Sequence, residues 1–146
     1  MRVDLALLCD SVTVREGLLH ILGGGVTRIV NPGPFPQVVP ISIALRMLGD
    51  RKEMQGGARH EIQGILSRDA GEFVAKFKVE FGADDDQIMT LYPGEEIPIA
   101  IPISMGVELP GHGGYAIDLV VDGVQQASVP FWVVEPPGLP TPRVRS

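Results

Sequence analysis

The sequence predicts an all-β protein built as a two-layer antiparallel sandwich of seven to eight strands. Short segments in which apolar and polar residues alternate strictly, separated by turn signals, point to this class. The 146 residues include 18 glycines and 13 prolines, about a fifth of the chain and above the average share. With 45% hydrophobic and 21% charged residues, the chain can bury a core, and its length fits one domain.

The N-terminal third predicts three strands. Val3, Leu5 and Leu7 alternate with polar or small residues, and residues 18–22 form a second short strand after the turn residues Arg15-Glu16-Gly17. Residues 11–14 could begin a helix, but their β-branched side chains disfavour it. Alternation from Ile41 to Met47 predicts the third strand.

Two hairpins follow, and they give the clearest local signals. Residues 60–68 and 73–81 flank the turn Asp69-Ala70-Gly71, and residues 115–121 and 124–134 flank Asp122-Gly123, a pair suited to a type I′ turn. The residues expected to face inward are Phe73, Ala75, Phe77, Val79 and Phe81 in the first hairpin and, if the turn fixes the register, Val129, Phe131 and Val133 in the second. Pro130 indicates an edge or a bulge there.

Residues 97–103 predict an edge strand, because Pro98 and Pro102 share its outward face and lack the N–H group that a ladder needs. Residues 31–36 read as a rigid loop that crosses between the two sheets, and residues 136–146 as a proline-rich extended tail. We therefore expect one sandwich domain over residues 1–135.

Charge and cysteine content limit the partners and the compartment. The net charge of −6 opposes binding to nucleic acid or to an anionic membrane surface. Cys9 is the one cysteine, so no intramolecular disulfide can form, and the apolar run from Leu5 to Cys9 is too short for a signal-peptide core. No run of residues reaches the length of a membrane helix. We expect a cytoplasmic protein.

Two segments could hold a ligand, but each has a simpler structural explanation. Gly23-Gly24-Gly25 lacks the lysine and the following helix of a phosphate-binding loop, which favours a bend or bulge before another strand. Asp84, Asp85 and Asp86 could offer oxygen atoms to a hard cation, but their spacing is not that of a calcium loop, which favours a solvated acidic turn.

No residue set predicts catalysis or a cofactor. His20, His60 and His112 are far apart in sequence, so a zinc site would have to be assembled by folding. Cys9 has apolar neighbours, which indicate an inert thiol. We expect that the protein is not an enzyme and needs no cofactor.

Trp132 is the best single candidate for a contact with another protein. Strand alternation turns it outward if Phe131 and Val133 face the core. The alternative, in which Trp132 packs against its own sheet or under the tail, carries equal weight, because tryptophan is largely buried in most proteins.

The strings Val3-Asp4-Leu5-Ala6-Leu7-Leu8-Cys9-Asp10 and Gly23-Gly24-Gly25-Val26-Thr27-Arg28-Ile29, with the later Gly114-Tyr115, Asp122-Gly123 and Phe131-Trp132-Val133, resemble the DUF6941 family. This is a bacterial family of small proteins, and the resemblance covers nearly the whole chain before the tail. It implies an immunoglobulin-like sandwich and a structural role for the three glycines. It implies no activity.

We therefore expect a non-catalytic module that works by protein contact, either with a partner protein or with itself as a homodimer. Trp132 and the exposed edge at Pro98 and Pro102 are the candidate interface residues. The alternative is a domain that binds a small ligand or a metal ion through the loops at the ends of the sandwich.

Overall fold

The computed structural model describes residues 1–138 and consists mainly of β-strands, as the sequence predicts. Within this range ten strands and two short helices follow one another along the chain. They are β1 (Arg2–Cys9), β2 (Ser11–Arg15), β3 (Leu18–Leu22), β4 (Arg28–Val30), β5 (Gln37–Gly49), α1 (Arg51–Met54), β6 (His60–Arg68), β7 (Glu72–Phe81), α2 (Asp85–Met89), β8 (Ile97–Leu109), β9 (Gly113–Val121) and β10 (Val124–Val134). The strand count exceeds the expected seven to eight because the short strands β2 and β4 both form, and β4 lies where a strand was expected after the three glycines.

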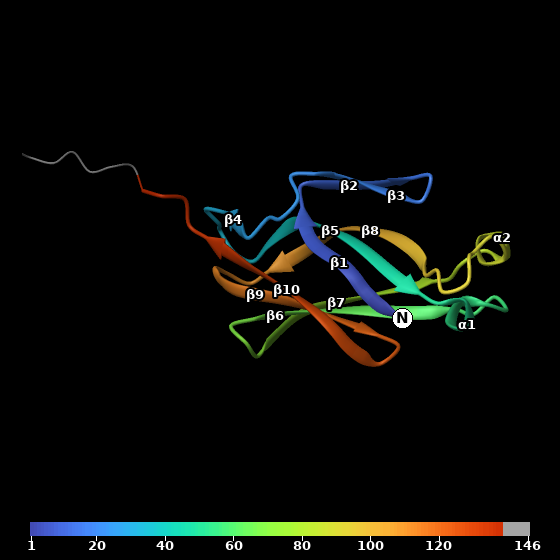
Figure 1. Ribbon diagram of the computed structural model, residues 1–146. Coiled ribbons are helices and arrows are strands. Elements are labelled where there is room, and N and C mark those ends of the chain that lie inside the picture. Colours follow the sequence, from blue (N-terminus) through green and yellow to red (C-terminus); the bar gives the residue numbers. More distant parts are fainter. Residues whose placement is uncertain (139–146) are drawn as a thin grey trace, which may run out of the picture.

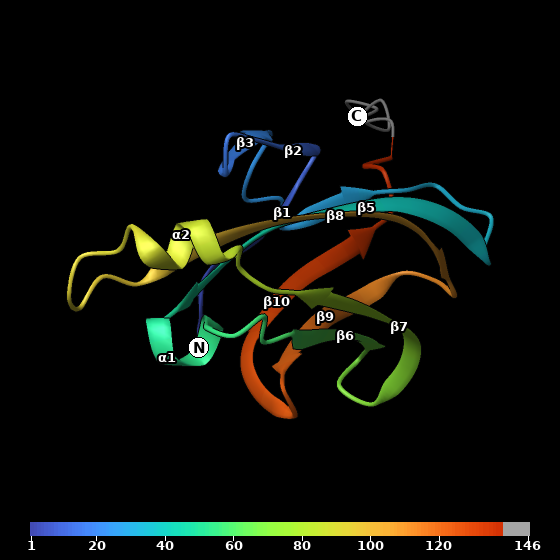
Figure 2. The ribbon, with the colours of Figure 1, turned by 90° about the vertical axis from the view of Figure 1, so that its right-hand side faces the viewer.

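The strands make three sheets. One has the order β1-β5-β8, the second β4-β10-β9-β6-β7, and the third is the hairpin β2-β3. The pairs are antiparallel except β4 with β10, which run in the same direction. The hairpin β2-β3 lies on the side of the three-stranded sheet that faces away from the five-stranded sheet (Figures 1 and 2).

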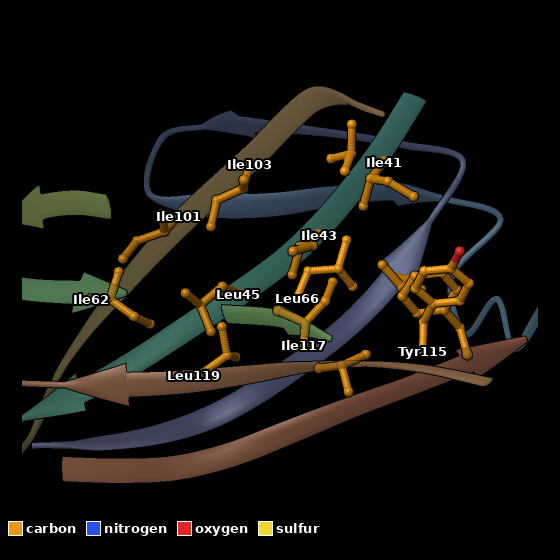
Figure 3. Packing of buried hydrophobic residues seen from close by; sticks show 14 of the residues in the cluster. Ile41, Ile43, Leu45, Ile62, Leu66, Ile101, Ile103, Tyr115, Ile117 and Leu119 are labelled. Carbon is orange, nitrogen blue, oxygen red and sulfur yellow. The ribbon is translucent and has the colours of Figure 1, made fainter. Parts of the chain in front are cut away.

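One hydrophobic cluster joins the three-stranded and the five-stranded sheets. Ile43 and Leu45 of β5 point toward Ile62 of β6 and Leu119 of β9, and all four side chains are fully buried (Figure 3). Alternation of apolar residues places them there, because every second side chain of a strand points to the same face. Burying side chains of this size stabilises the fold by about 1.5–3 kcal/mol each.

Both predicted hairpins are confirmed. β6 pairs with β7 and β9 pairs with β10, each antiparallel. Asp122 and Gly123 have φ angles of 46° and 84°, the left-handed values that a type I′ turn requires. The predicted loop 31–36 carries the chain from β4 in the five-stranded sheet to β5 in the three-stranded sheet.

The inward set of β10 is confirmed, but the turn alone does not produce it. Val129, Phe131 and Val133 are buried. Val124 lies opposite Val121, so an unbroken register would turn Val129 outward beside Ala116. The register shifts between Gln125 and Ala127, leaving Gln126 as an extra residue, and Val129 then faces inward beside Ile117. This β-bulge changes which residues of the strand face the core.

A second bulge makes one sequence expectation wrong. The register of β6 and β7 shifts so that Leu66 lies opposite Ala75 but Ser67 lies opposite Phe73, leaving Val74 as the extra residue. Val74 packs against the core, whereas Phe73, expected to face inward, is 61% exposed. Strict alternation therefore fails at the beginning of β7.

A third bulge, at Asp4, breaks the alternation of β1. The register shifts between Val3 and Leu5, so that Val3, Ala6 and Leu8 pack against the main core. Leu7 packs instead under the hairpin β2-β3. The carboxylate of Asp4 forms an ion pair with the guanidinium of Arg46 on β5.

Two short helices were not predicted. In α1 the Asp50 carboxylate accepts a hydrogen bond from the Glu53 amide at 2.7 Å, and the Glu53 side chain accepts one from the Asp50 amide. Before α2 the Gln87 side chain accepts a hydrogen bond from the Asp84 amide. Both segments have the capping-box spacing, a signal that could have predicted them.

The structure tests the predicted edge strand and part of the predicted tail. β8 is an edge strand of its sheet, and the side chains of Pro98 and Pro102 are exposed, as predicted. At Pro130, β10 pairs with β9 alone, because β4 begins to pair only at Trp132. Residues 136–138 have no regular structure, and the rest of the predicted tail, 139–146, lies outside the described residues.

Substituting Tyr115 by phenylalanine tests how the chain is held where it enters β9. The buried Tyr115 hydroxyl donates a 2.6 Å hydrogen bond to the carbonyl of Gly111. Its loss leaves a buried acceptor unpaired, so the variant should lose about 1–3 kcal/mol of unfolding free energy in urea titrations. The control is Tyr92→Phe, since Tyr92 is 78% exposed. Equal stability of the two variants would contradict the prediction.

Candidate interaction surface

Trp132 lies on the solvent side of the five-stranded sheet, as strand alternation predicts. Its side chain is 58% exposed, although its neighbours Phe131 and Val133 are buried. The indole ring lies over Gly114 on β9, where a Cβ atom would come within 3.2 Å of the ring. Part of the Trp132 ring therefore packs on its own sheet, and the rest is exposed to solvent. This position is intermediate between the two predicted alternatives, an outward-facing Trp132 and one packed against its own sheet.

Phe73, a residue that the sequence placed in the core, is on the same face. The paired positions Pro130, Ala116, Ser67 and Phe73 form one row across β10, β9, β6 and β7. Paired residues point to the same side of a sheet, and Ala116 faces away from the core because Ile117 is buried. Phe73 and Trp132 therefore lie on the same face of the sheet, separated by the small residues Ala116 and Ser67.

The next two rows toward the Asp122-Gly123 turn carry charge and further apolar side chains. One row contains Asp118, Ile65 and Lys76, and the following row contains Val120, Gln63 and Lys78. We call these rows, together with Trp132, Gly114 and the row that ends at Phe73, the outer face. Lys78 contacts Glu61 of its own chain at 3.3 Å. Within residues 1–138 Asp118 and Lys76 form no ion pair.

The opposite outside surface of the molecule is partly covered by the chain itself. Val12 of β2 packs with Ala44 of β5 and Cys9 of β1, and Leu19 of β3 adds to this small cluster. Pro102 pairs with Ala44 and so lies beside the covered region, whereas Pro98 lies opposite Leu48 nearer α1. The contact role expected for the two prolines stays a prediction.

The candidate metal ligands Asp84, Asp85 and Asp86 do not form a loop of converging oxygen atoms. Asp84 precedes α2, and Asp85 and Asp86 occupy its first turn, where the helix dipole favours negative charge. In the described part of the chain, no three His, Cys, Asp or Glu side chains lie close enough to hold a metal ion.

The three glycines make a bend that closes against β1. The amides of Gly25 and Val26 donate hydrogen bonds to the carbonyl of Leu8, and the Asp10 amide donates to Leu22. Gly23 has a φ angle of 60°, and a Cβ atom there would collide with the Asp10 carboxylate at 2.2 Å. The positive φ disfavours any residue with a Cβ atom, and such a residue would also displace the Asp10 carboxylate, which supports the predicted structural role.

Beside this bend is a cavity of about 430 Å³ between the end of β1, β4 and the beginning of β5. Its walls include Leu8 and Ile41 together with the polar side chains of Asp10, Arg28 and Asn31. His112 lies near this cavity, because its Nε2 atom is 2.7 Å from the Asn31 carbonyl. The glycine bend and His112 thus both lie near β4, whereas α2 lies at the opposite end of the molecule from β4 (Figure 1).

The thiol of Cys9 is buried, and burial together with the negative charge of Asp10 raises its pKa. A raised pKa lowers the thiolate fraction at neutral pH, so the prediction of an unreactive thiol gains support.

No local sequence pattern indicates the pair formed by His60 and Asp122, which are 62 residues apart. The Nδ1 atom of His60 lies 2.6 Å from the Asp122 carboxylate, and its Nε2 atom lies 2.8 Å from the Glu53 carbonyl. Asp122 also accepts a 2.9 Å hydrogen bond from the Glu61 amide. Because both partners of the ring are acceptors, His60 satisfies both bonds only when it is protonated.

The pKa values of the pair reflect this geometry. Burial opposes the charged form of His60, but the hydrogen bonds to Asp122 and to the Glu53 carbonyl, together with the negative charges of these two residues, outweigh it and raise the pKa of the imidazole above 6.5. Burial likewise opposes the charge of Asp122, and the hydrogen bonds from Glu61 and His60 outweigh it and lower the pKa of that carboxyl. The pair holds the β9-β10 turn against the beginning of β6.

The fold and this surface define an all-β protein with one sheet face largely open to solvent. A family model described as a family of unknown function, DUF6941, matches residues 4–134, and the chain belongs to this family. The resemblance seen in the sequence is thereby confirmed. A comparison with curated proteins gave no match. Among the described residues, no helix combines the length and the apolar character needed to cross a membrane.

The His60 pair should make stability depend on pH. A raised folded-state pKa stabilises the protein fully at pH values below 6.5, and this contribution disappears as the pH rises through the raised pKa. Between pH 6 and pH 8 the unfolding free energy should fall by about 1 kcal/mol, since the charged hydrogen bonds are partly screened by solvent.

Urea titrations of the unmodified protein, of His60→Gln and of the control His20→Gln measure this dependence, since His20 is exposed on β3. The decrease should be absent in His60→Gln and retained in His20→Gln. The same pH dependence in all three proteins would rule out His60 as its source.

Proposed function

We propose that this chain is a non-catalytic cytoplasmic module that acts by protein contact through the outer face of its five-stranded sheet. The observation that carries the proposal is that Trp132 and Phe73, at 58% and 61% exposure, project from that face. Aromatic side chains with small neighbours are typical anchors of protein interfaces. The hairpin β2-β3 packs on part of the opposite outside surface, so that surface is less open to a partner.

We further propose that the fold is an immunoglobulin-like sandwich. The order β1-β5-β8 matches strands A, B and E of that fold, and β10-β9-β6 matches G, F and C. Tyr115, near the start of the strand equivalent to F, donates its hydroxyl hydrogen bond to Gly111 four residues earlier, which is the arrangement of a tyrosine corner. In this assignment the hairpin β2-β3 is an insertion between β1 and β4.

Replacing the anchors tests the contact role. Trp132→Ser and Phe73→Ser should each weaken association at least about tenfold, because anchor residues at interfaces contribute about 2 kcal/mol or more. Light scattering coupled to size exclusion over a concentration range measures self-association, and capture from a lysate measures binding to another protein.

The matched control is Tyr92→Ser, which removes a side chain that is 78% exposed and lies between α2 and β8, away from the outer face. The proposal fails if the unmodified protein stays monomeric and retains no partner that the Trp132 variant loses.

The cavity beside the glycine bend favours one alternative, a domain that binds a small ligand through the loops at this end. Its volume of about 430 Å³ is within the range of ligand sites, and Arg28 and Asn31 supply polar groups at its wall. A ligand of the native state raises the unfolding temperature. Small carboxylates, which could pair with Arg28, should therefore raise it, and an unchanged unfolding temperature across a panel of them would oppose the alternative.

A further inference from the structure

We propose that the partner of the outer face is a second copy of this chain, related by a two-fold axis that runs parallel to β6. This inference rests on the proposed function and specifies its partner. When two copies of one sheet face each other across a two-fold axis, the axis lies in the plane between them. An axis along β6 places β9 of one copy over β7 of the other.

The charges of one row of the outer face match this arrangement. Asp118, Ile65 and Lys76 occupy one row on β9, β6 and β7. The axis along β6 sets Asp118 opposite the partner's Lys76 and sets Ile65 opposite the partner's Ile65. Each interface then contains this ion pair twice, with an apolar contact at its centre.

The other in-plane axis, at right angles to the strands, is disfavoured by the same residues. Passing through the same row, it would place Asp118 opposite the partner's Asp118 and Lys76 opposite the partner's Lys76. Like charges placed opposite one another disfavour association. The row of Asp118 and Lys76 therefore distinguishes the two geometries.

The exposed aromatic side chains also fit the axis along β6. Phe73 and Trp132 are three strands apart, about 14 Å, so they do not touch within one chain. The axis brings the partner's Phe73 over Ala116, next to Gly114 and Trp132. The absence of a side chain on Gly114 and the short one on Ala116 leave room for that ring beside the indole.

The overlap that this axis produces is small. The three strands β9, β6 and β7 and the nine residues of β6 span about 14 by 27 Å, roughly 400 Å² in projection. The accessible surface of a corrugated sheet exceeds its projection, and a standard interface buries roughly 800 Å² per partner, so the contact belongs at the small end of specific interfaces.

Charge reversal tests the pairing of Asp118 with the partner's Lys76. Lys76→Asp and Asp118→Lys should each weaken the dimer about tenfold or more, because each puts like charges together. The double variant, which restores opposite charges, should return to within about threefold of the unmodified dimer, and its recovery separates pairing from general damage. The control Lys52→Asp changes the charge on α1, outside the outer face.

Crosslinking tests the position of the axis. In a Cys9→Ala background, Ile65→Cys should give a covalent dimer with a short bis-maleimide, because Ile65 lies on the axis and faces its own copy. Ser128→Cys on β10 is the control, since in this geometry it lies about four strand spacings, or roughly 19 Å, from its copy. Unfolding temperatures confirm that every variant is folded.

The outcomes separate this inference from the proposed function. Recovery in the double variant together with a crosslink at Ile65→Cys supports the two-fold axis. A dimer that Trp132→Ser disrupts, but that shows neither recovery nor that crosslink, overturns the axis and leaves the outer face as the contact surface. A monomer at every concentration overturns the second copy as partner, and the proposed function then depends on whether Trp132→Ser abolishes binding to another protein.

Discussion

The extra residue at Gln126 determines which side of β10 belongs to the core. Without it, the turn at Asp122-Gly123 would pair Val129 with Ala116 and send Phe131 outward. With it, Phe131 stacks on Tyr115 at a ring distance of 5.3 Å, and Trp132 projects into solvent. The Gln126 side chain accepts a hydrogen bond from the Val3 amide and donates one to the Met1 carbonyl, so the same bulge joins β10 to β1.

The bulges also explain what the sequence could and could not predict. Alternation and turn residues predicted both hairpins, the buried strand around Ile43 and the edge strand with its two prolines. A bulge, however, is a property of two paired strands, and one strand's pattern does not reveal it. Phe73 alternates with its neighbours as a core residue would, yet the extra residue Val74 turns it outward. The sequence pattern therefore places Phe73, one of the two exposed aromatic residues of the outer face, in the core.

Long-range contacts set the second limit. His60 and Asp122 come into contact because β9 pairs with β6, and no local sequence feature of either residue predicts this contact. The two helices escape prediction for a different reason. Their capping signals at Asp50 and Asp84 are local, but segments of four and five residues are too short for a helical periodicity of apolar residues to show. Strand alternation predicts that Trp132 points outward, because its neighbours Phe131 and Val133 are both strongly apolar and are expected to face the core.

Trp132 is the one tryptophan of the chain, so its fluorescence reports directly on the outer face. We would record its emission maximum and its quenching by acrylamide from dilute to concentrated solution, in the unmodified protein and in Phe73→Ser. If the outer face binds a second copy, emission shifts to shorter wavelength and quenching decreases as concentration rises, and Phe73→Ser suppresses both changes. Emission and quenching that stay constant in the unmodified protein would contradict a contact between copies through this face.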